Sequence, residues 1–433
     1  MIEKRVGLYT LGCKVSQYET EAIAERFESY GYKVCDFSDT NDVYVINTCT
    51  VTAEADRKSR QMIRRAKKQN PDSVVIVCGC YSQRSPEEVA LIPDVDAVIG
   101  SGGKLSVPDI AEELLVKRER IINVTDIDKE PFERMAITKG PRTRVYVKIE
   151  DGCECRCTYC AIPSARGAVR SKAREDVIAE VESLSASGVR EVVLTGIETG
   201  SYGKDFSDVY TLADLIVELD ERRSCERIRL GSLAPELVGE SFVQKIAGAK
   251  ILVPHFHISM QSGSSSVLRA MKRRYSRQML LDNIARIKRA IPRATFTTDI
   301  MVGFPGESEQ DFLESVSALR EIGFLDAHVF AYSRRKNTPA DLYPDQIPES
   351  VKRDRSERLI AAAKEVRLGV VDGILSSGEP MPVIFEEREG NILRGHSDTF
   401  VTVEVECDED LRTEARTVLP VSRKGDIIIG KII

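Results

Sequence analysis

Short apolar runs alternate with amphipathic stretches along the first part of the chain. VGLYTLG, VYVINT and SVVIVCG have the composition of buried strands, and segments with helical periodicity follow them. In the first such segment, Ser16 and Glu19 have the spacing of a capping box, which predicts a helix to about Tyr30. Strands that alternate with helices in this way indicate a parallel sheet of βαβ units. We expect this N-terminal domain to span residues 3–115.

A second series of strand-like runs follows a connection rich in proline and charge, between about Asn123 and Arg144. The runs are VYVKI, EVVLTG, RIRLGS, HFHISM, TFTTDIMVG and DAHVFAYS, with amphipathic helical patterns between them. They predict a partial or complete α/β barrel over residues 139–370, with its chemistry in the loops after the strands. Residues 373–433 change to short β runs separated by turns, which indicates a small all-β module of OB-like size.

Composition and net charge exclude several classes of protein. The chain has 433 residues, of which 42% are hydrophobic and 30% charged, and this balance excludes a disordered or membrane-embedded chain. The N-terminal MIEKRVGLYTLGCK lacks the apolar stretch of a signal peptide, so we expect a cytoplasmic protein with no membrane partner. A net charge of -6 argues against non-specific nucleic-acid binding, so a nucleic acid requires a local basic patch.

The strongest basic run lies on the predicted helix from about Ala53 to Gln69. It includes Arg57, Arg60 and Arg64, and it begins shortly after a cysteine, Cys49. A solvated helix face is the alternative interpretation. Arg394 belongs to a more modest patch in the C-terminal module.

Eleven cysteines are the main chemical feature of the chain, because structural disulfides are not expected in a reducing cytosol. Cys13, Cys49 and Cys80 each follow a predicted strand of the N-terminal domain. Ligands of open parallel sheets lie beyond the carboxyl ends of the strands, so these thiols are expected to meet in one crevice. Three thiolates there suit an iron–sulfur cluster with one open coordination position. The alternative is three unrelated buried cysteines, since free cysteine also packs as a small hydrophobe.

A second set of cysteines is local. Cys153, Cys157 and Cys160 form a C-x3-C-x2-C array directly after the first strand of the middle domain. Three thiolates on one short loop hold three irons of a 4Fe–4S cluster and leave the fourth iron for a small chelating ligand. Zinc prefers four closed ligands, and no fourth Cys or His follows at finger-like spacing. Zinc remains the alternative, and Cys155 provides an alternative ligand to Cys153.

At these residues the chain resembles the radical S-adenosylmethionine superfamily, whose hallmark is C-x3-C-x2-C with an aromatic residue before the last cysteine. LGCKVSQYETE, INTCTVT and GCYSQ are similar to motifs of its methylthiotransferase family, and so are CTYCAIPSARG, LTGIETGSYG, HISMQSGSSSVLRAMKRRY and TTDIMVGFPGES. The terminal β module resembles that family's RNA-binding TRAM domain. LGCKV followed by QYETE is most similar to the branch that acts on N6-threonylcarbamoyladenosine in tRNA. The chain departs from the family pattern at Ser16, Glu198 and Ala234, where Asn, Asn or Asp, and an acidic residue are usual.

The resemblance implies two 4Fe–4S clusters and S-adenosyl-L-methionine. It assigns Cys153, Cys157 and Cys160 to the catalytic cluster that cleaves S-adenosylmethionine, and the N-terminal trio to an auxiliary cluster that carries sulfur. A radical then activates C2 of the adenine ring, whose C–H bond is not acidic. Cofactor-binding positions are expected in the loops and strand ends of the barrel: Tyr159, for adenine stacking, and Gly196, Glu198, Ser232, Gln261 and Asp299. Arg166 is a further candidate, either to neutralise a carboxylate or as a surface ion pair. His255 and His257 share a strand face, which favours packing over metal binding.

The implied activity converts N6-threonylcarbamoyladenosine next to the anticodon to its 2-methylthio derivative. The implied partners are the tRNA anticodon loop, an electron donor such as flavodoxin or ferredoxin, and a sulfur source. Alternatives are methylthiolation of an isopentenyl-type adenosine or of a ribosomal protein side chain, and a non-catalytic RNA-binding protein stabilised by zinc or a cluster.

Overall fold

The N-terminal part of the protein is a parallel α/β layer structure. The structure is a computed structural model that describes residues 3–140 and 143–433. A six-stranded parallel sheet has the order β2-β1-β3-β4-β5-β6. Its strands are β1 (Arg5–Thr10), β2 (Lys33–Cys35), β3 (Val43–Thr48), β4 (Val74–Gly79), β5 (Ala97–Ile99) and β6 (Ile121–Asn123). The helices are α1 (Lys14–Ser29), α2 (Ala53–Gln69), α3 (Cys80–Arg84), α4 (Pro86–Ala90) and α5 (Val107–Lys117).

Helices cover both faces of this sheet, which explains why every residue of β3 and β4 is buried. On one face, Phe27 of α1 packs in a core with Val45 and with Leu114 of α5. On the other face, Ile63 of α2 packs with Ile46. The predicted parallel βαβ domain is therefore confirmed, and its last strand, β6, lies beyond residue 115.

The predicted capping box is wrong. Helix α1 begins at Lys14 with Cys13 at its N-cap, so Ser16 and Glu19 lie inside the helix. Glu19 is fully buried, and its carboxylate accepts hydrogen bonds from buried cations instead of reaching back to the helix N-terminus. The sequence spacing of a capping box does not distinguish these two environments.

The middle of the chain forms a partial barrel of parallel strands. One sheet has the order β11-β10-β7 and another the order β12-β13-β14-β15, and a bridge between Ile228 and Leu252 lies between them. The strands are β7 (Arg144–Lys148), β10 (Glu191–Thr195), β11 (Arg227–Leu230), β12 (Ser232–Leu233), β13 (His255–Gln261), β14 (Thr295–Val302) and β15 (Asp326–Ala331), and a short antiparallel pair, β8 (Glu150–Asp151) and β9 (Arg170–Ser171), follows β7. The helices are α6 (Ile162–Arg166), α7 (Arg174–Ala186), α8 (Leu212–Arg222), α9 (Glu240–Ile246), α10 (Ser265–Ala270), α11 (Arg277–Ala290), α12 (Glu309–Ile322) and α13 (Glu349–Ser377). This architecture confirms the partial-barrel prediction.

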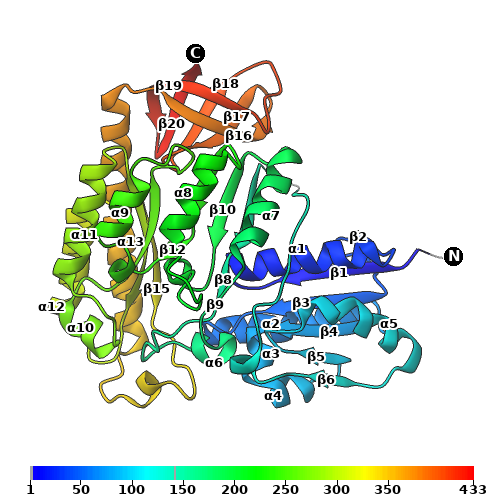
Figure 1. The fold of residues 1–433 in the computed structure, drawn as a ribbon. Coiled ribbons are helices and arrows are strands. Elements are labelled where there is room, and N and C mark those ends of the chain that lie inside the picture. Colours follow the sequence, from blue (N-terminus) through cyan, green and yellow to red (C-terminus); the bar gives the residue numbers. More distant parts are fainter. Residues whose placement is uncertain (1–2, 141–142) are drawn as a thin grey trace.

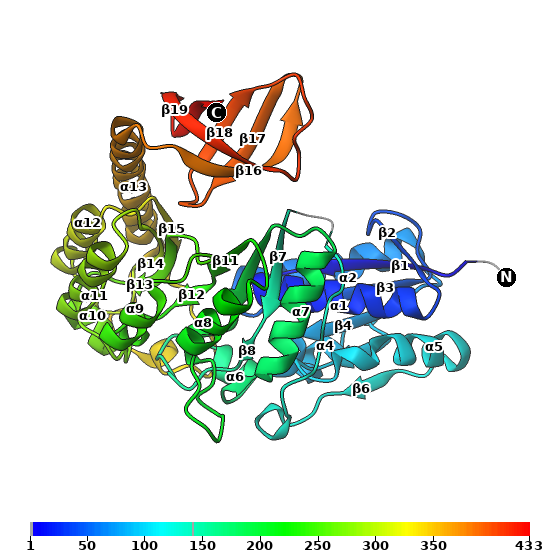
Figure 2. The same ribbon diagram turned by 45° about the horizontal axis from the view of Figure 1, so that its top comes forward.

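The N-terminal domain contacts both edges of the partial barrel. Tyr18 of α1 is part of the barrel core, and α1 packs along edge strand β7. At the other edge, Arg335 follows β15 and donates hydrogen bonds to Thr50 and Asp56, each at 2.7 Å. Figure 2 shows the N-terminal domain beside the barrel. The start of α1 therefore lies at the open side of the barrel, between β7 and β15.

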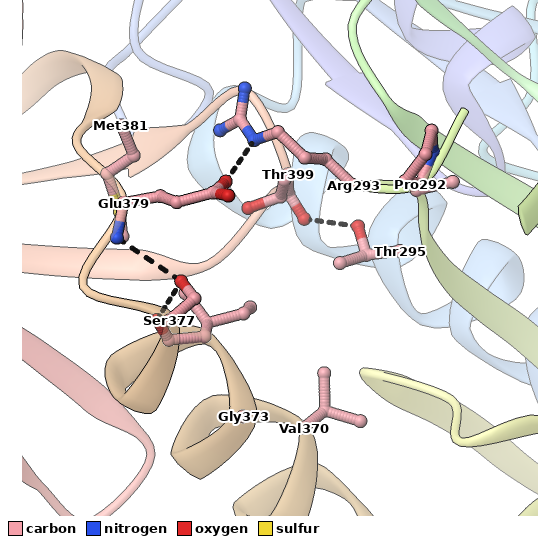
Figure 3. A pocket seen from close by; sticks show the side chains of 11 residues that line it. Pro292, Arg293, Thr295, Val370, Gly373, Ser377, Glu379, Met381 and Thr399 are labelled. Carbon is pink, nitrogen blue, oxygen red and sulfur yellow. Dashed lines mark hydrogen bonds and ion pairs between the residues drawn. The ribbon is translucent and has the colours of Figure 1, made fainter.

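The C-terminal module is a closed barrel in the order β16-β17-β18-β20-β19, as the sequence predicts. Its strands are β16 (Met381–Glu389), β17 (Ile392–Ser397), β18 (Thr402–Glu406), β19 (Ala415–Lys424) and β20 (Ile427–Ile432). Helix α13 leads into it, and the module sits at one end of the partial barrel (Figure 1). At the junction, Thr295 Oγ1 at the start of β14 donates to the carbonyl of Thr399 at 2.6 Å, beside the ion pair between Arg293 and Glu379 at 3.7 Å (Figure 3). The module thus contacts the amino ends of the barrel strands, away from the cysteine loop.

No helix in the described part of the chain is both long enough and apolar enough to cross a bilayer.

Candidate active site

The three N-terminal cysteines lie at the carboxyl edge of the N-terminal sheet. Cys13 precedes α1, Cys49 directly follows β3, and Cys80 directly follows β4. Burial raises the pKa of the Cys49 thiol to about 12, and the nearby thiols of Cys80 and Cys13 add to the shift. A Cβ on Gly12, whose φ is +118°, would lie 3.3 Å from the Cys49 sulfur. The fold therefore places these three residues, far apart in sequence, at the same edge of the sheet, and their use as ligands of one cluster stays a prediction.

The local cysteine loop is held by close backbone packing. Cys153 donates its backbone N–H to the carbonyl of Gly167 at 3.0 Å. Gly152 has a φ of +90°, and a Cβ there would lie 1.8 Å from the carbonyl oxygen of Ala168. Only glycine fits this position, because both the backbone angle and the space exclude a side chain.

The sulfur atoms of this loop accept hydrogen bonds. The sulfurs of Cys153 and Cys160 each accept from the backbone N–H two residues later, at 3.5 and 3.4 Å. Arg273 Nη1 donates to the Cys157 sulfur at 3.5 Å. Burial raises the pKa of Cys160 to about 12, so a metal would have to displace the proton. Such donors stabilise bound thiolates and tune the potential of a cluster.

The donor set fits multi-iron clusters better than single ions. No three His, Cys, Asp or Glu side chains among residues 3–140 and 143–433 converge closely enough to hold one metal ion. A 4Fe–4S cluster does not require such convergence, because its thiolates bind separate irons. Cys155 is half-buried, and a hydrogen bond from Cys153 lowers its pKa to about 6. Both thiols are half-buried, so Cys155 stays an alternative ligand to Cys153.

Arg166 connects the two cysteine sets. It ends α6, just after the cysteine loop, and its side chain is fully buried. Its Nε donates to the Cys80 sulfur at 3.1 Å. Its Nη1 donates to Glu19 at 2.5 Å and to Asp151 at 3.2 Å. Arg166 therefore neutralises carboxylates, and the surface interpretation is wrong.

The surroundings of Arg166 form a buried ionic cluster, the Arg166 cluster, which consists of Glu19, Lys104, Lys148, Asp151 and Arg166. Glu19 pairs with both lysines and with Arg166, and Lys148 also pairs with Asp151 at 2.7 Å. None of the five side chains is more than 6% exposed. Among these five side chains three cations face two carboxylates, and the guanidinium of Arg166 is the positive charge beside Cys80. A buried charge requires compensation, and a thiolate-bound, negatively charged cluster would supply it.

No sequence pattern predicts that the members of the Arg166 cluster lie together. Glu19, Lys104 and Lys148 come from three separate elements of two domains. No local spacing relates them, and only the three-dimensional fold brings them together.

Gly196 and Glu198 lie beside a second buried carboxyl group. A Cβ on Gly196 would lie 2.5 Å from Oε2 of Glu150, so glycine is required there by Glu150. The same oxygen accepts the backbone N–H of Glu198 at 2.8 Å. The Glu198 carboxylate accepts the N–H of Ala234 at 3.0 Å, and burial raises its pKa to about 7. Two departures from the family pattern, Glu198 and Ala234, therefore contact each other.

The remaining predicted cofactor residues lie in different environments. Tyr159 packs edge-on against Phe304, with ring centroids 6.4 Å apart. Ser232 begins β12 and is half-buried, and Gln261 ends β13 with a φ of +59°. A backbone angle in this region is costly for a residue other than glycine and marks a constrained turn.

Asp299 does not end its strand, in contrast to the sequence expectation. It lies inside β14, and its carboxylate pairs with His257 at 3.0 Å and with His328 at 3.2 Å. These partners hold the pKa of Asp299 well below its usual value, despite burial. His255 and His257 both contact Thr297 Oγ1, at 3.1 and 2.9 Å, so they share a face as predicted.

The predicted RNA-binding arginines differ in whether their side chains already have a hydrogen-bond or ion-pair partner. Arg57 pairs with Glu54, Arg60 donates to Tyr81 at 2.9 Å, and Arg394 pairs with Glu404 at 2.5 Å. Arg64 is exposed on α2 and has no hydrogen bond or ion pair within the described residues.

Two protein-family models match the N-terminal domain and the partial barrel. The model of the uncharacterized protein family UPF0004 matches residues 5–100, and that of the radical SAM superfamily matches residues 147–319. Among solved structures, the radical S-adenosylmethionine methyltransferase TsrM from Kitasatospora setae has a TM-score of 0.58 at 15% identity, covering 79% of this chain and 77% of its own. The fold is therefore that of a radical SAM protein.

Several curated proteins of similar sequence show to which family of radical SAM proteins the chain belongs. The threonylcarbamoyladenosine tRNA methylthiotransferase MtaB of Bacillus subtilis is 42% identical over 94% of this chain and 91% of its own length. The protein of the same name from Aquifex aeolicus is 39% identical over 81% of this chain and 86% of its own length. The tRNA-2-methylthio-N(6)-dimethylallyladenosine synthase of Carboxydothermus hydrogenoformans is 34% identical, with 85% of each chain covered. The chain belongs to the methylthiotransferase family of radical SAM proteins.

Proposed function

We propose that this protein is a tRNA methylthiotransferase that converts N6-threonylcarbamoyladenosine next to the anticodon to its 2-methylthio derivative. The identity of 42% to a relative named for this activity supports the substrate branch. The observation that carries the chemistry is the contact between Arg166, beside the cysteine loop of the barrel, and Cys80 of the N-terminal trio. This contact supports the proposal that the two cluster sites face one active centre.

Cys153, Cys157 and Cys160 would hold the catalytic 4Fe–4S cluster, and Cys13, Cys49 and Cys80 the auxiliary one. Together with S-adenosylmethionine, these groups supply radical activation of adenine C2, the inserted sulfur and the methyl group. This reaction needs them because no side chain can remove a proton from a non-acidic C–H bond.

The protein's own residues orient and stabilise these sites. Arg166 holds Cys80 by a hydrogen bond and supplies the positive charge that a thiolate-rich group requires. Arg273 does the same at Cys157. The buried carboxyl groups of Glu150 and Glu198 fix the loops after β10 and β12, on which cofactor contacts of Gly196, Glu198 and Ser232 would depend. Gln261 would contact the cofactor from the end of β13. Tyr159 would contact the adenine of S-adenosylmethionine. Asp299, which lies inside β14 and pairs with two histidines, would also contact the cofactor.

We assign tRNA binding to the basic face of α2, chiefly Arg64, with Arg57, Arg60 and Arg394 in supporting roles. In this proposal residues 3–115 form the methylthiotransferase domain, residues 139–370 the radical SAM core and residues 373–433 a TRAM RNA-binding domain. The enzyme would act in the cytoplasm, with electrons from a flavodoxin or ferredoxin and with an external sulfur source.

The test is the reaction of anaerobically reconstituted protein with two tRNA substrates. One carries N6-threonylcarbamoyladenosine and the other the dimethylallyl modification, and mass spectrometry of the nucleosides follows each product. The proposal predicts the methylthio product only from the threonylcarbamoyl substrate. Product only from the dimethylallyl tRNA, or from neither, contradicts it.

A further inference from the structure

The interior of the partial barrel is a cavity of about 250 Å³. Alternate residues of the strands line it, as expected where side chains alternate across a sheet: Arg144 and Tyr146 of β7, His255 and His257 of β13, and Asp326 and His328 of β15, with further residues from β10, β11 and β14. Lys14 at the start of α1 completes the lining from the N-terminal domain. The cavity is therefore the barrel lumen, and one wall of it belongs to the segment that carries Cys13.

The lumen has a floor made by the C-terminal module. Phe400 lines the cavity and stacks on His255, with ring centroids 4.7 Å apart. The guanidinium of Arg229 lies 4.8 Å from the centre of the Phe400 ring. His255 is 4% exposed, and its Nδ1 is buried without a hydrogen-bond partner in the described chain. An unpartnered polar atom in a closed-ended cavity indicates a place for a polar ligand group.

The other charges around the lumen are already paired. Arg144 and Arg229 both pair with Glu191, and Arg144 also pairs with Glu386. His257 and His328 pair with Asp299. On the β15 side, Asp326 lies 3.5 Å from Arg367. These groups make the lumen polar without leaving a strong unpaired charge among them.

Lys14 is different. No hydrogen bond or ion pair joins its ammonium group to any residue within 3–140 and 143–433, and its side chain remains accessible to solvent from the lumen. A single unpaired cation in a polar, closed-ended cavity is suited to a ligand with one negative charge.

We propose that Lys14 is a specificity-determining residue that binds the carboxylate of the threonylcarbamoyl group inside the barrel lumen. This inference rests on the proposed function. The substituent on N6 leaves the adenine ring from a different edge than C2, so the ring can present C2 to the thiols while its substituent enters the lumen. His255 Nδ1 supplies a second polar contact for this substituent. A dimethylallyl group has no charge and gains nothing from Lys14.

The experiment compares affinities of reconstituted protein for three anticodon stem-loops: unmodified, threonylcarbamoylated, and threonylcarbamoylated with its carboxylate converted to a methyl ester. The variants are Lys14→Met, which keeps length but removes charge, and Lys14→Arg, which keeps the charge. Lys117→Met, on the exposed face of α5, is the matched control. Iron content in each variant reports whether the neighbouring Cys13 site is intact, and cleavage of S-adenosylmethionine reports whether the catalytic cluster is intact.

The wild type and Lys117→Met should prefer the free carboxylate over the ester by about 10- to 100-fold, the usual effect of a hydrogen bond to a charged group. Lys14→Met should lose this preference while it keeps its iron and its affinity for the unmodified stem-loop. Lys14→Arg should retain most of the preference. Equal preference in Lys14→Met and wild type overturns the inference, as does an equal loss of affinity for all three stem-loops. If the wild type forms product only from dimethylallyl tRNA, the proposed function is wrong. If the wild type forms product from threonylcarbamoyl tRNA and Lys14→Met has the same KM for that tRNA, only the inference about Lys14 is wrong.

Discussion

Replacement of Arg166 by methionine tests the electrostatic coupling of the two cysteine sites. Methionine keeps an unbranched apolar stem but loses the hydrogen bonds of the guanidinium to Cys80, Glu19 and Asp151. Glu19 keeps Lys104 and Lys148 as partners, so its charge is not stranded. The Arg166 cluster then becomes neutral, and the positive charge beside Cys80 is gone.

Two magnitudes follow from this change. Hydrogen bonds to charged groups contribute about 1.5–3 kcal/mol, and the loss of Arg166 strands no buried charge, so the expected loss in the free energy of unfolding is about 3 kcal/mol. The lost hydrogen bond to the Cys80 thiolate weakens cluster binding by about 1.5–3 kcal/mol, which is roughly 10- to 100-fold. Arg166→Lys should be intermediate, because lysine keeps the charge but cannot bridge three partners.

The assay isolates the auxiliary site. In a background with Cys153, Cys157 and Cys160 all changed to alanine, reconstituted protein should bind about four irons. Adding Arg166→Met should remove most of them, and urea denaturation of the apoprotein measures the stability loss. The control is Arg134→Met, at a surface arginine paired with Asp176, which should leave both the iron content and the free energy of unfolding close to their starting values. Full iron retention together with a stability loss under 1 kcal/mol would refute the coupling.

Three further predictions concern single groups. Burial raises the pKa of Glu198 from 4.5 to about 7, so its contribution to the free energy of unfolding is fully present below pH 4.5 and is lost as the pH rises through 7. This loss amounts to at most about 3 kcal/mol, and it should be absent in Glu198→Gln, as measured by urea denaturation at pH 5 and pH 8. Cys155→Ala should keep both clusters while Cys153→Ala loses the catalytic one, and the reverse pattern in iron analysis would assign Cys155 as the ligand. Arg64→Ala should weaken tRNA binding and reduce the slope of log affinity against log salt by roughly one, and an unchanged slope would remove Arg64 from the interface.

Much of the fold could be predicted because it depends on local patterns. The strand-like runs and the helices between them recur as β1, β3, β4 and the strands of the partial barrel. The positions of Cys13, Cys49 and Cys80 after predicted strands placed them at one edge of the sheet, since parallel strands end at one edge. Gly152 shows a similar local constraint in the structure, because its backbone angle and its close neighbours admit only glycine.

The site's electrostatics could not be predicted from the sequence. The sequence around Glu19 is compatible with a capping box and with a buried ion pair. The ion pair forms because Lys148 of another domain lies next to Glu19 in the fold. Asp299 was expected at a strand end, but strand length depends on pairing with β13 and β15. Lys14 has no local pattern that distinguishes a lumen residue from an ordinary surface lysine.

The central claim is that two trios of cysteines hold two clusters with separate tasks, and Cys13→Ala tests it most directly. The measurement follows iron content, cleavage of S-adenosylmethionine and methylthio product in the same anaerobic preparation. The wild type should hold about eight irons, whereas Cys13→Ala should fall toward about four. The variant should still cleave S-adenosylmethionine but form no methylthio nucleoside. Wild-type yield of product by Cys13→Ala, or equal loss of cleavage and product with the catalytic iron still present, would contradict the claim.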